Sequence, residues 1–191
     1  MSKSLYIAEK PSVAQEFANA LKINGRRSDG YIESEQAIVT WCVGHLVTMS
    51  YPECYDPKYK RWSLETLPFL PKEFKYEVIP SVEKQFKIVS GLLNRPDVDT
   101  IYVCTDSGRE GEYIYRLVAQ MADVKDKAQK RVWIDSQTEE EILRGIREAK
   151  DETEYDNLSA SAYLRAKEDY LMGINFSRLL TLKYGQNISN Y

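Results

Sequence analysis

The chain has 191 residues, 43% of them hydrophobic, and a formal net charge of −3 at pH 7. This length fits one complete domain and part of a second, with enough apolar content for an ordinary core. The mild charge excludes a histone-like binder and an acidic disordered chain, so a nucleic-acid partner would need local basic clusters. No apolar run approaches the roughly 18 residues of a membrane span, and we expect neither a signal peptide nor a membrane helix.

The three cysteines, Cys42, Cys54 and Cys104, show no CxxC spacing. We expect reduced thiols in a cytoplasmic protein, in the core or near the surface. A zinc site would need more ligands than the sequence offers, because His45 is the only histidine.

In chain order, the first expected element is a buried strand over residues 5–8, followed by a polar turn. Apolar residues at helical spacing over residues 13–21 then predict a helix, with Pro11 at its start. A second strand is expected over residues 37–43. Residues 50–80 hold five of the seven prolines, and we expect an ordered, aromatic-rich excursion there instead of regular helix.

The following residues alternate between strand and helix patterns. Strands are expected over residues 74–79, 100–104 and 131–134, and helices around residues 82–93, 114–121 and 138–146. This alternation predicts an α/β fold with a mainly parallel sheet covered by helices. After residue 153 the strands stop and a charged helix follows, so we expect one domain over residues 1–152 and the start of another over residues 153–191.

Acidic residues follow two of the predicted strands. Glu9 comes directly after the first strand, and Asp106 follows the strand that ends at Cys104. Ligands of open parallel sheets bind beyond the carboxyl ends of the strands, so neighbouring strands would bring both carboxylates into one crevice. Glu110 then enters from the start of the next helix. Because three clustered carboxylates repel one another, the pattern favours a hard cation such as Mg²⁺.

Two cations flank these acids. Lys10 and Arg109 are suited to contact a phosphate, and the pattern as a whole indicates phosphoryl-transfer or phosphodiester chemistry. The loop is not a Walker A motif, because GxxxxGK[ST] is absent. An ordinary solvated turn, in which Arg109 pairs with Glu112, is the alternative interpretation.

Four motifs together have a specific resemblance. AEKPS, VGHL, TDSGREGE and DYLMGINFSR, in this order, resemble the N-terminal part of type IA DNA topoisomerases, in particular the topoisomerase III branch. The resemblance implies a Toprim (Rossmann-like) domain over residues 1–152, with a mainly parallel four-stranded sheet flanked by helices. Residues 153–191 would be the truncated, helical start of the domain that forms a groove for single-stranded DNA.

The same resemblance implies roles for the acidic loop and its neighbours. Glu9 would be the general acid at the leaving deoxyribose oxygen and lie near the metal, and Lys10 would position the scissile phosphate. Asp106 and Glu110 match the first and third acids of the family's DxDxE motif, so Glu9, Asp106 and Glu110 are the expected Mg²⁺ ligands. Arg109, inside that motif, is the third expected catalytic residue.

DNA-binding positions are also implied. His45, Arg131, Arg165 and Asp169 match family positions near DNA, and the last two, four residues apart on a helix, can form a pair that aims the guanidinium at a phosphate. For His45 a structural hydrogen bond is the alternative, and for Arg131 a charge at a strand edge. The aromatic and basic residues of the excursion, Tyr51 to Trp62, either stack on bases or pack onto their own domain.

Two departures from the family pattern matter. Gly108 stands where the middle acid of DxDxE is expected, so the metal would depend on Glu9, Glu112, DNA phosphate and water. None of the fourteen tyrosines lies in the context of the family's nucleophile, and Tyr191 is interpreted as the point at which a longer chain was cut. The parent enzyme would cleave one strand through a phosphotyrosine, pass another strand and religate with Mg²⁺, whereas this piece would be inactive in cleavage.

The expected partners are DNA, in single-stranded segments, and the remaining topoisomerase domains, in a cytoplasmic, nucleoid-associated protein. Two alternatives remain from other classes. One is another Toprim protein, of the nuclease, primase or RNA-maturation type. The other is a non-catalytic DNA-binding module that has lost its metal through Gly108.

Overall fold

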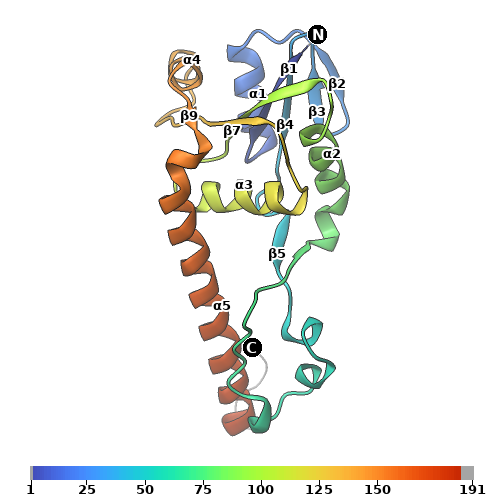
Figure 1. Ribbon diagram of the computed structural model, residues 1–191, viewed down its shortest axis with the longest axis vertical. Coiled ribbons are helices and arrows are strands. Elements are labelled where there is room, and N and C mark those ends of the chain that lie inside the picture. The colour runs from blue at the N-terminus through green and yellow to red at the C-terminus, as the bar shows by residue number, and fades with distance from the viewer. Residues whose placement is uncertain (1, 186–191) are drawn as a thin grey trace. The chain divides into compact units, whose positions relative to one another are not determined.

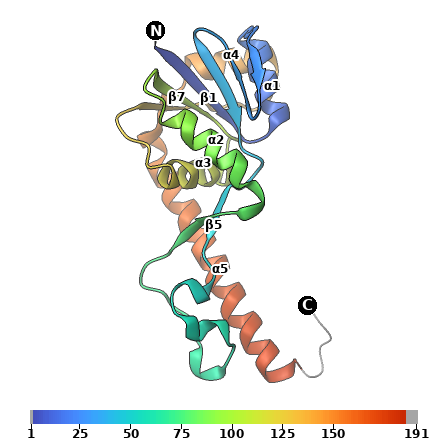
Figure 2. The same cartoon turned by 90° about the vertical axis from the view of Figure 1, so that its right-hand side faces the viewer.

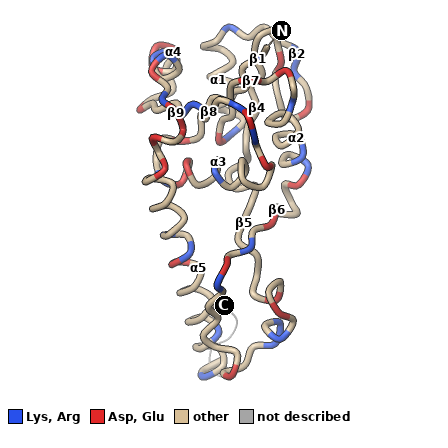
Figure 3. The backbone as a smooth tube through the Cα atoms, in the orientation of Figure 1, with Lys and Arg blue, Asp and Glu red and all other residues tan. Residues whose placement is uncertain are grey.

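The structure is a computed structural model that describes residues 2–185, so Tyr191 and the interpretation attached to it lie outside the described residues. The chain divides into two compact units, Met1–Thr48 with Val78–Ala162 and Met49–Glu77 with Tyr163–Tyr191. This division differs from the expected boundary at residue 152, because the proline-rich excursion groups with the later part of the long C-terminal helix. Residues of both charges are interspersed along the two units (Figure 3), in keeping with the net charge of −3.

The first unit is built on a seven-stranded sheet in the order β2-β3-β4-β1-β7-β8-β9 (Figure 1). Its strands are β1 (Lys3–Ala8), β2 (Arg26–Ser28), β3 (Tyr31–Glu33), β4 (Ala37–Trp41), β7 (Val98–Cys104), β8 (Ala128–Arg131) and β9 (Lys150–Asp151). The pairs β4–β1, β1–β7 and β7–β8 are parallel, which confirms the expected α/β fold with a mainly parallel central sheet. The sheet has seven strands where four were expected. The antiparallel strands β2, β3 and β9 extend it at the two edges. The strand expected over residues 131–134 lies earlier, and Val132–Trp133 follow its end.

Helices cover both faces of this sheet (Figure 2). They are α1 (Pro11–Ala20), α2 (Glu83–Leu93), α3 (Arg109–Met121), α4 (Glu139–Arg147) and the first part of α5 (Asp156–Tyr184). Alternate residues of β1 point to opposite faces, so Tyr6 and Ala8 pack with buried residues of α1 and α4. Leu5 and Ile7, both 0% exposed, therefore face the side that α2 and α3 cover. The helical cover explains why these strands read as continuous apolar runs.

The register of the parallel strands aligns their carboxyl ends. Ala8 of β1 pairs with Trp41 of β4 on one side and with Cys104 of β7 on the other. The residues that follow these three strands therefore emerge at one edge of the sheet, as the strand order predicted.

The second unit packs the proline-rich excursion against the later part of α5. The excursion contains three short 3-10 helices, Pro52–Cys54, Pro57–Lys60 and Leu64–Thr66, and it is preceded by β5 (Val47–Met49) and followed by β6 (Tyr76–Val78), which pair with each other. Phe69 is 1% exposed, and its ring contacts those of Tyr55 and Tyr59 at centroid distances of 5.2 and 4.9 Å. The aromatic residues thus pack within this unit, although Tyr51 is 63% exposed.

Polar side chains of α5 hold the excursion in place. Asn175 accepts from the Phe69 N–H (2.6 Å) and donates to the Phe69 carbonyl (3.0 Å), and the Tyr170 hydroxyl donates to the Ser50 carbonyl (2.7 Å). Arg178, only 5% exposed, donates to the Tyr59 carbonyl (3.1 Å). These bonds satisfy backbone groups that a chain without strand partners leaves unpaired.

Replacing Asn175 tests this anchor. Asn175→Ala leaves both backbone groups of Phe69 without their partner, so we expect the free energy of unfolding to fall by about 1–3 kcal/mol. Amide hydrogen exchange should become faster at Phe69 in particular. Ser177→Ala, an exposed position on the same helix, is the control and should change neither quantity. Unchanged protection of the Phe69 amide would contradict the assigned role.

Candidate metal and phosphate site

Two carboxylates meet where β1 and β7 end. Glu9 follows β1 and is 7% exposed, whereas Asp106 lies two residues beyond β7 and is exposed. The Asp106 N–H donates to Glu9 Oε2 at 3.2 Å, so the two residues that sequence analysis placed at one edge do lie side by side. Burial, followed by the negative charge of Asp106, raises the pKa of Glu9, while the Asp106 N–H, Lys10 and His45 oppose that shift. The environment therefore favours a protonated Glu9 more than water does.

Glu110 lies in the first turn of α3 and interacts with the histidine instead of the other acids. His45 Nε2 lies 2.5 Å from Glu110 Oε1, and the two side chains are 37% and 73% exposed. The histidine follows β4, and its ring is 6.0 Å from that of Tyr113. Since His45 also acts on the pKa of Glu9, it lies near both acids. Lys10 and Arg109 are both exposed at this edge, where a phosphate could reach them.

The donor set suits a magnesium ion that keeps most of its own water. Among residues 2–185, no group of three or more His, Cys, Asp or Glu side chains is arranged to hold a metal ion. Glu9 and Asp106 provide two neighbouring carboxylates, and Mg²⁺ is commonly held by one or two carboxylates with waters and substrate phosphates. The residues present therefore fit a metal completed by a phosphate, and they do not form a cage made only of protein ligands.

Glu112 is not available as the substitute ligand considered from the sequence. It is 0% exposed, and its oxygens lie 2.8 Å from Arg116 Nε and 3.3 Å from Arg131 Nε. The alternative of a simple turn in which Arg109 pairs with Glu112 is also wrong, because those two arginines are its partners. Nothing in the local sequence signals this burial, since GREGE is polar throughout.

Arg131 lies inside the protein. It was expected to contact DNA, but its side chain is 0% exposed, and its guanidinium donates to Thr105 Oγ1 (2.7 Å) and to the Asp106 carbonyl (2.6 Å). This burial does not support a direct contact with DNA. The alternative for Arg131, a charge at a strand edge, is also corrected, because the charge lies in the core. The cysteines Cys42 and Cys104 are buried free thiols and Cys54 is an exposed one, as expected.

The Arg165–Asp169 pair, in the second unit, forms as predicted. Arg165 Nε lies 2.9 Å from Asp169 Oδ2, and both side chains are 63% exposed on α5. Water screens an exposed pair of this kind, so it contributes little to stability.

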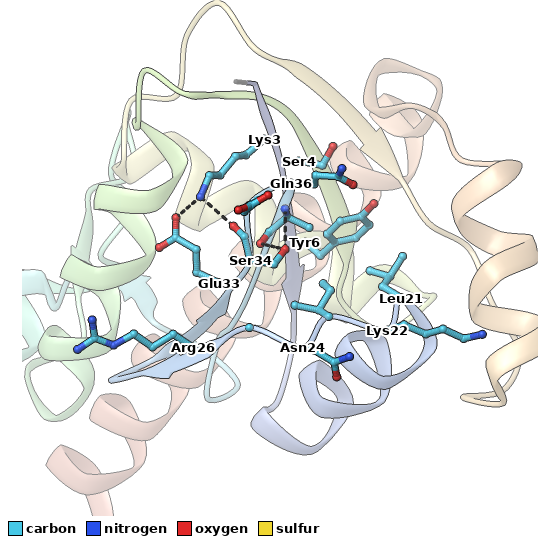
Figure 4. A pocket seen from close by; sticks show the side chains of 14 residues that line it. Lys3, Ser4, Tyr6, Leu21, Lys22, Asn24, Arg26, Glu33, Ser34 and Gln36 are labelled. Carbon is cyan, nitrogen blue, oxygen red and sulfur yellow. Dashed lines mark hydrogen bonds and ion pairs between the residues drawn. The ribbon is translucent and has the colours of Figure 1, made fainter.

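Two cavities of the first unit lie at opposite edges of the sheet. One of about 320 Å³ borders the site, lined by residues that include Asp106, Ser107 and Asp135. A larger one, about 850 Å³, lies at the amino end of β1 (Figure 4). There Lys3 Nζ already binds Glu33 Oε1 (2.6 Å) and the Ser34 carbonyl (2.9 Å). Parallel sheets bind ligands at the carboxyl ends of their strands, so the smaller cavity is the better candidate.

Comparison with known proteins supports the α/β fold described above. The Toprim domain model matches residues 4–136. The chain belongs to the Toprim family. It is 46% identical over 187 residues to DNA topoisomerase 3 of Staphylococcus epidermidis, covering 98% of this chain and 26% of that protein. DNA topoisomerase 3 of Bacillus cereus is 46% identical over 189 residues, covering 99% of this chain and 26% of the relative. The chain is thus homologous to the N-terminal region of type IA topoisomerases 3 and spans about a quarter of their length.

The glycines of the acidic loop of this Toprim domain differ in what they allow. A Cβ at Gly111 would lie 2.0 Å from the Asp106 carbonyl oxygen, whereas a Cβ at Gly108 would meet nothing within 4 Å. We therefore expect Gly111→Ala to lower the free energy of unfolding by about 1–3 kcal/mol. Gly108→Ala, the matched control, should change it by less than about 1 kcal/mol and in the stabilising direction. Equal effects of the two substitutions in urea unfolding would contradict the close approach.

Glu152 should make stability depend on pH. Burial and the neighbouring Glu112 raise the pKa of Glu152 from 4.5 to about 8. The folded state binds this proton more tightly than the unfolded state, so the stabilisation is complete below pH 4.5 and is lost as pH rises through about 8. At about 1.4 kcal/mol for each pKa unit, this shift corresponds to a decline of up to about 5 kcal/mol between pH 4.5 and 8, which Glu152→Gln should remove. The exposed neighbour, in Glu154→Gln, should retain it; parallel urea-unfolding profiles for wild type and Glu152→Gln would exclude this role.

Proposed function

We propose that this Toprim domain is the acidic, magnesium-binding half of the cleavage and religation site of a type IA DNA topoisomerase. The observation that supports this most is the hydrogen-bonded approach of Glu9 and Asp106 at 3.2 Å, in a chain 46% identical to DNA topoisomerase 3. The parent enzyme would change DNA topology by transient single-strand cleavage through a phosphotyrosine, strand passage and religation. The tyrosine would come from outside this chain, which we expect to be inactive in cleavage by itself.

Each residue of the site has a role that follows from its surroundings. Glu9, whose pKa is raised by burial, would hold a proton and deliver it to the leaving deoxyribose oxygen. Asp106, joined by Glu9 once that carboxyl has given up its proton, would hold Mg²⁺, which would supply positive charge to the phosphate. Lys10 and Arg109, exposed at the same edge, would bind the phosphate oxygens and orient the scissile bond. Glu110 reaches the metal only if it leaves His45.

The DNA contacts are the less direct part of the proposal. His45, at the rim of the site, would bind DNA beside the scissile phosphate, and Arg165, held by Asp169 (2.9 Å), would bind a phosphate of a single-stranded segment. Among residues 2–185, no helix has the length and apolarity to cross a bilayer. A cytoplasmic location at the nucleoid is part of the proposal, because the substrate is DNA. Nothing observed favours the nuclease, primase or RNA-maturation alternatives or a non-catalytic binding module.

A chimera tests this function directly. The aligned region of the Staphylococcus epidermidis DNA topoisomerase 3 is replaced by this chain, and relaxation of negatively supercoiled DNA is followed against Mg²⁺ concentration. We expect the chimera to be active, and Glu9→Gln or Asp106→Asn to lower the rate by about 100-fold or more, because each removes a proton donor or metal ligand. Glu16→Gln, an exposed acid of α1, is the control and should retain full activity.

Two outcomes would reject the proposal. A folded chimera without Mg²⁺-dependent relaxation would show that this chain does not supply the site. Cleavage of single-stranded DNA by the 191-residue chain alone would instead favour the nuclease alternative.

A further inference from the structure

A buried pair of opposite charges lies beneath the acidic loop. Glu112, in α3, and Arg131, at the end of β8, are both 0% exposed, and Arg131 Nε lies 3.3 Å from Glu112 Oε2. Neither side chain can reach a substrate from this position. Both belong to segments that form the site, yet the proposed function gives neither of them a role.

The guanidinium of Arg131 is bonded to the loop that presents Asp106. It donates to Thr105 Oγ1 (2.7 Å), to the Asp106 carbonyl (2.6 Å) and to the Val103 carbonyl (3.3 Å). The Thr105 hydroxyl in turn donates to the Gly111 carbonyl (2.7 Å), which closes the loop. Since the Asp106 N–H binds Glu9, Arg131 fixes one end of the residue and Glu9 the other.

Glu112 is itself held from the opposite side. Its Oε1 accepts from Arg116 Nε (2.8 Å). Arg116 also binds Glu152, through both the side chain (3.1 Å) and the backbone carbonyl (2.6 Å), and Asp156 in the first turn of α5 (2.9 Å). Through Arg116, the Glu112 carboxylate therefore links Arg131, beneath the acidic loop, to the segment that leads into α5.

Stability alone is a poor reason to bury these charges. An ion pair in the core gains little net free energy over well-packed apolar residues of similar volume, because both charges lose their water. What apolar residues cannot do is donate several hydrogen bonds in fixed directions, as the planar guanidinium does. Arg131 is further held with its guanidinium carbon 5.5 Å from the centre of the Trp133 ring, which stacks on Tyr155 at 5.4 Å.

We propose that Glu112 and Arg131 are positioning residues for the metal-binding carboxylate of Asp106. The charge of Glu112, 3.3 Å from Arg131 Nε but without a hydrogen bond to it, holds the guanidinium in place. The guanidinium in turn fixes, by hydrogen bonds, the backbone from which Asp106 meets Glu9. The inference rests on the proposed function only for the metal, because the effect on the Asp106 backbone follows from the contacts alone. Neither residue touches the substrate.

The experiment compares Glu112→Gln and Arg131→Lys with Val118→Ala in the 191-residue chain. Val118 is a fully buried residue of the same helix, more than one turn beyond Glu112, so it controls for lost stability. NMR measures the hydrogen exchange of the Asp106 amide and its shift on titration with MgCl₂. We expect exchange at Asp106 to rise about tenfold more than global unfolding explains. Mg²⁺ affinity should fall about 10- to 100-fold, as with other lost supports of a metal ligand.

The control separates positioning from stability. Val118→Ala should increase exchange only in proportion to its loss of stability and leave Mg²⁺ affinity unchanged. If Glu112→Gln and Arg131→Lys behave like this control in both measurements, the inference is wrong. Should both variants unfold, Thr105→Val removes one acceptor of Arg131 without removing a charge, and it must show the same selective exchange at Asp106.

The readouts also separate this inference from the proposed function. If Mg²⁺ does not shift the wild-type Asp106 resonance and the chimera is inactive, the proposed function fails, while amide exchange still decides whether Arg131 holds the loop. If the chimera is active but Asp106 exchange is normal in both variants, only the positioning role is overturned.

Discussion

The pairing register of β1 is the constraint on which the site depends. β1 lies between β4 and β7, with Ala8 opposite both Trp41 and Cys104. The chain therefore emerges from the ends of these three strands at the same level of the sheet. Glu9, Asp106 and His45 follow those strands. The register of the strands by itself brings these residues together, and no separate contact between distant loops is needed. A slip of two residues in one pair would move Glu9 or Asp106 along the strand direction by about 7 Å, so the two carboxylates could not share an ion.

This constraint explains which parts of the site the sequence could predict. Glu9 and Asp106 follow apolar runs, so strand direction alone places them at one edge, and the structure confirms it. The partners of Glu112 and Arg131 could not be predicted, because they depend on how α3 lies over β8. The pairing of Glu110 with His45 is likewise set by the distance between the loop after β4 and the first turn of α3, 65 residues apart in the chain.

The fold shows the same limit. Periodicity identified β1, β4 and β7 and the helices beside them, whose apolar patterns are local properties of each segment. It placed β8 three residues too late and missed the short edge strands β2, β3 and β9. It did not show that residues 49–77 group with the later part of α5, since an excursion of short 3-10 helices has no period and Phe69 and its partner Asn175 are 106 residues apart. Asn175, with Tyr170 and Arg178, makes this long-range contact, and single polar residues in a helix give no signal of it in the sequence.

The space around the backbone of the acidic loop, finally, bears on the middle acid of the DxDxE motif, which this chain lacks. Glycine is required at position 111, because the Asp106 carbonyl occupies the place that a side chain would take. Gly108, by contrast, has open space around it and an extended φ of 171°, which any residue can adopt. The loop would therefore accept an aspartate at position 108 without rearrangement. Its absence is a difference in charge at the site and not a consequence of the fold. Under the proposed function, a site with fewer carboxylates would repel a phosphate less, and it would leave more of a metal's coordination to that phosphate and to water.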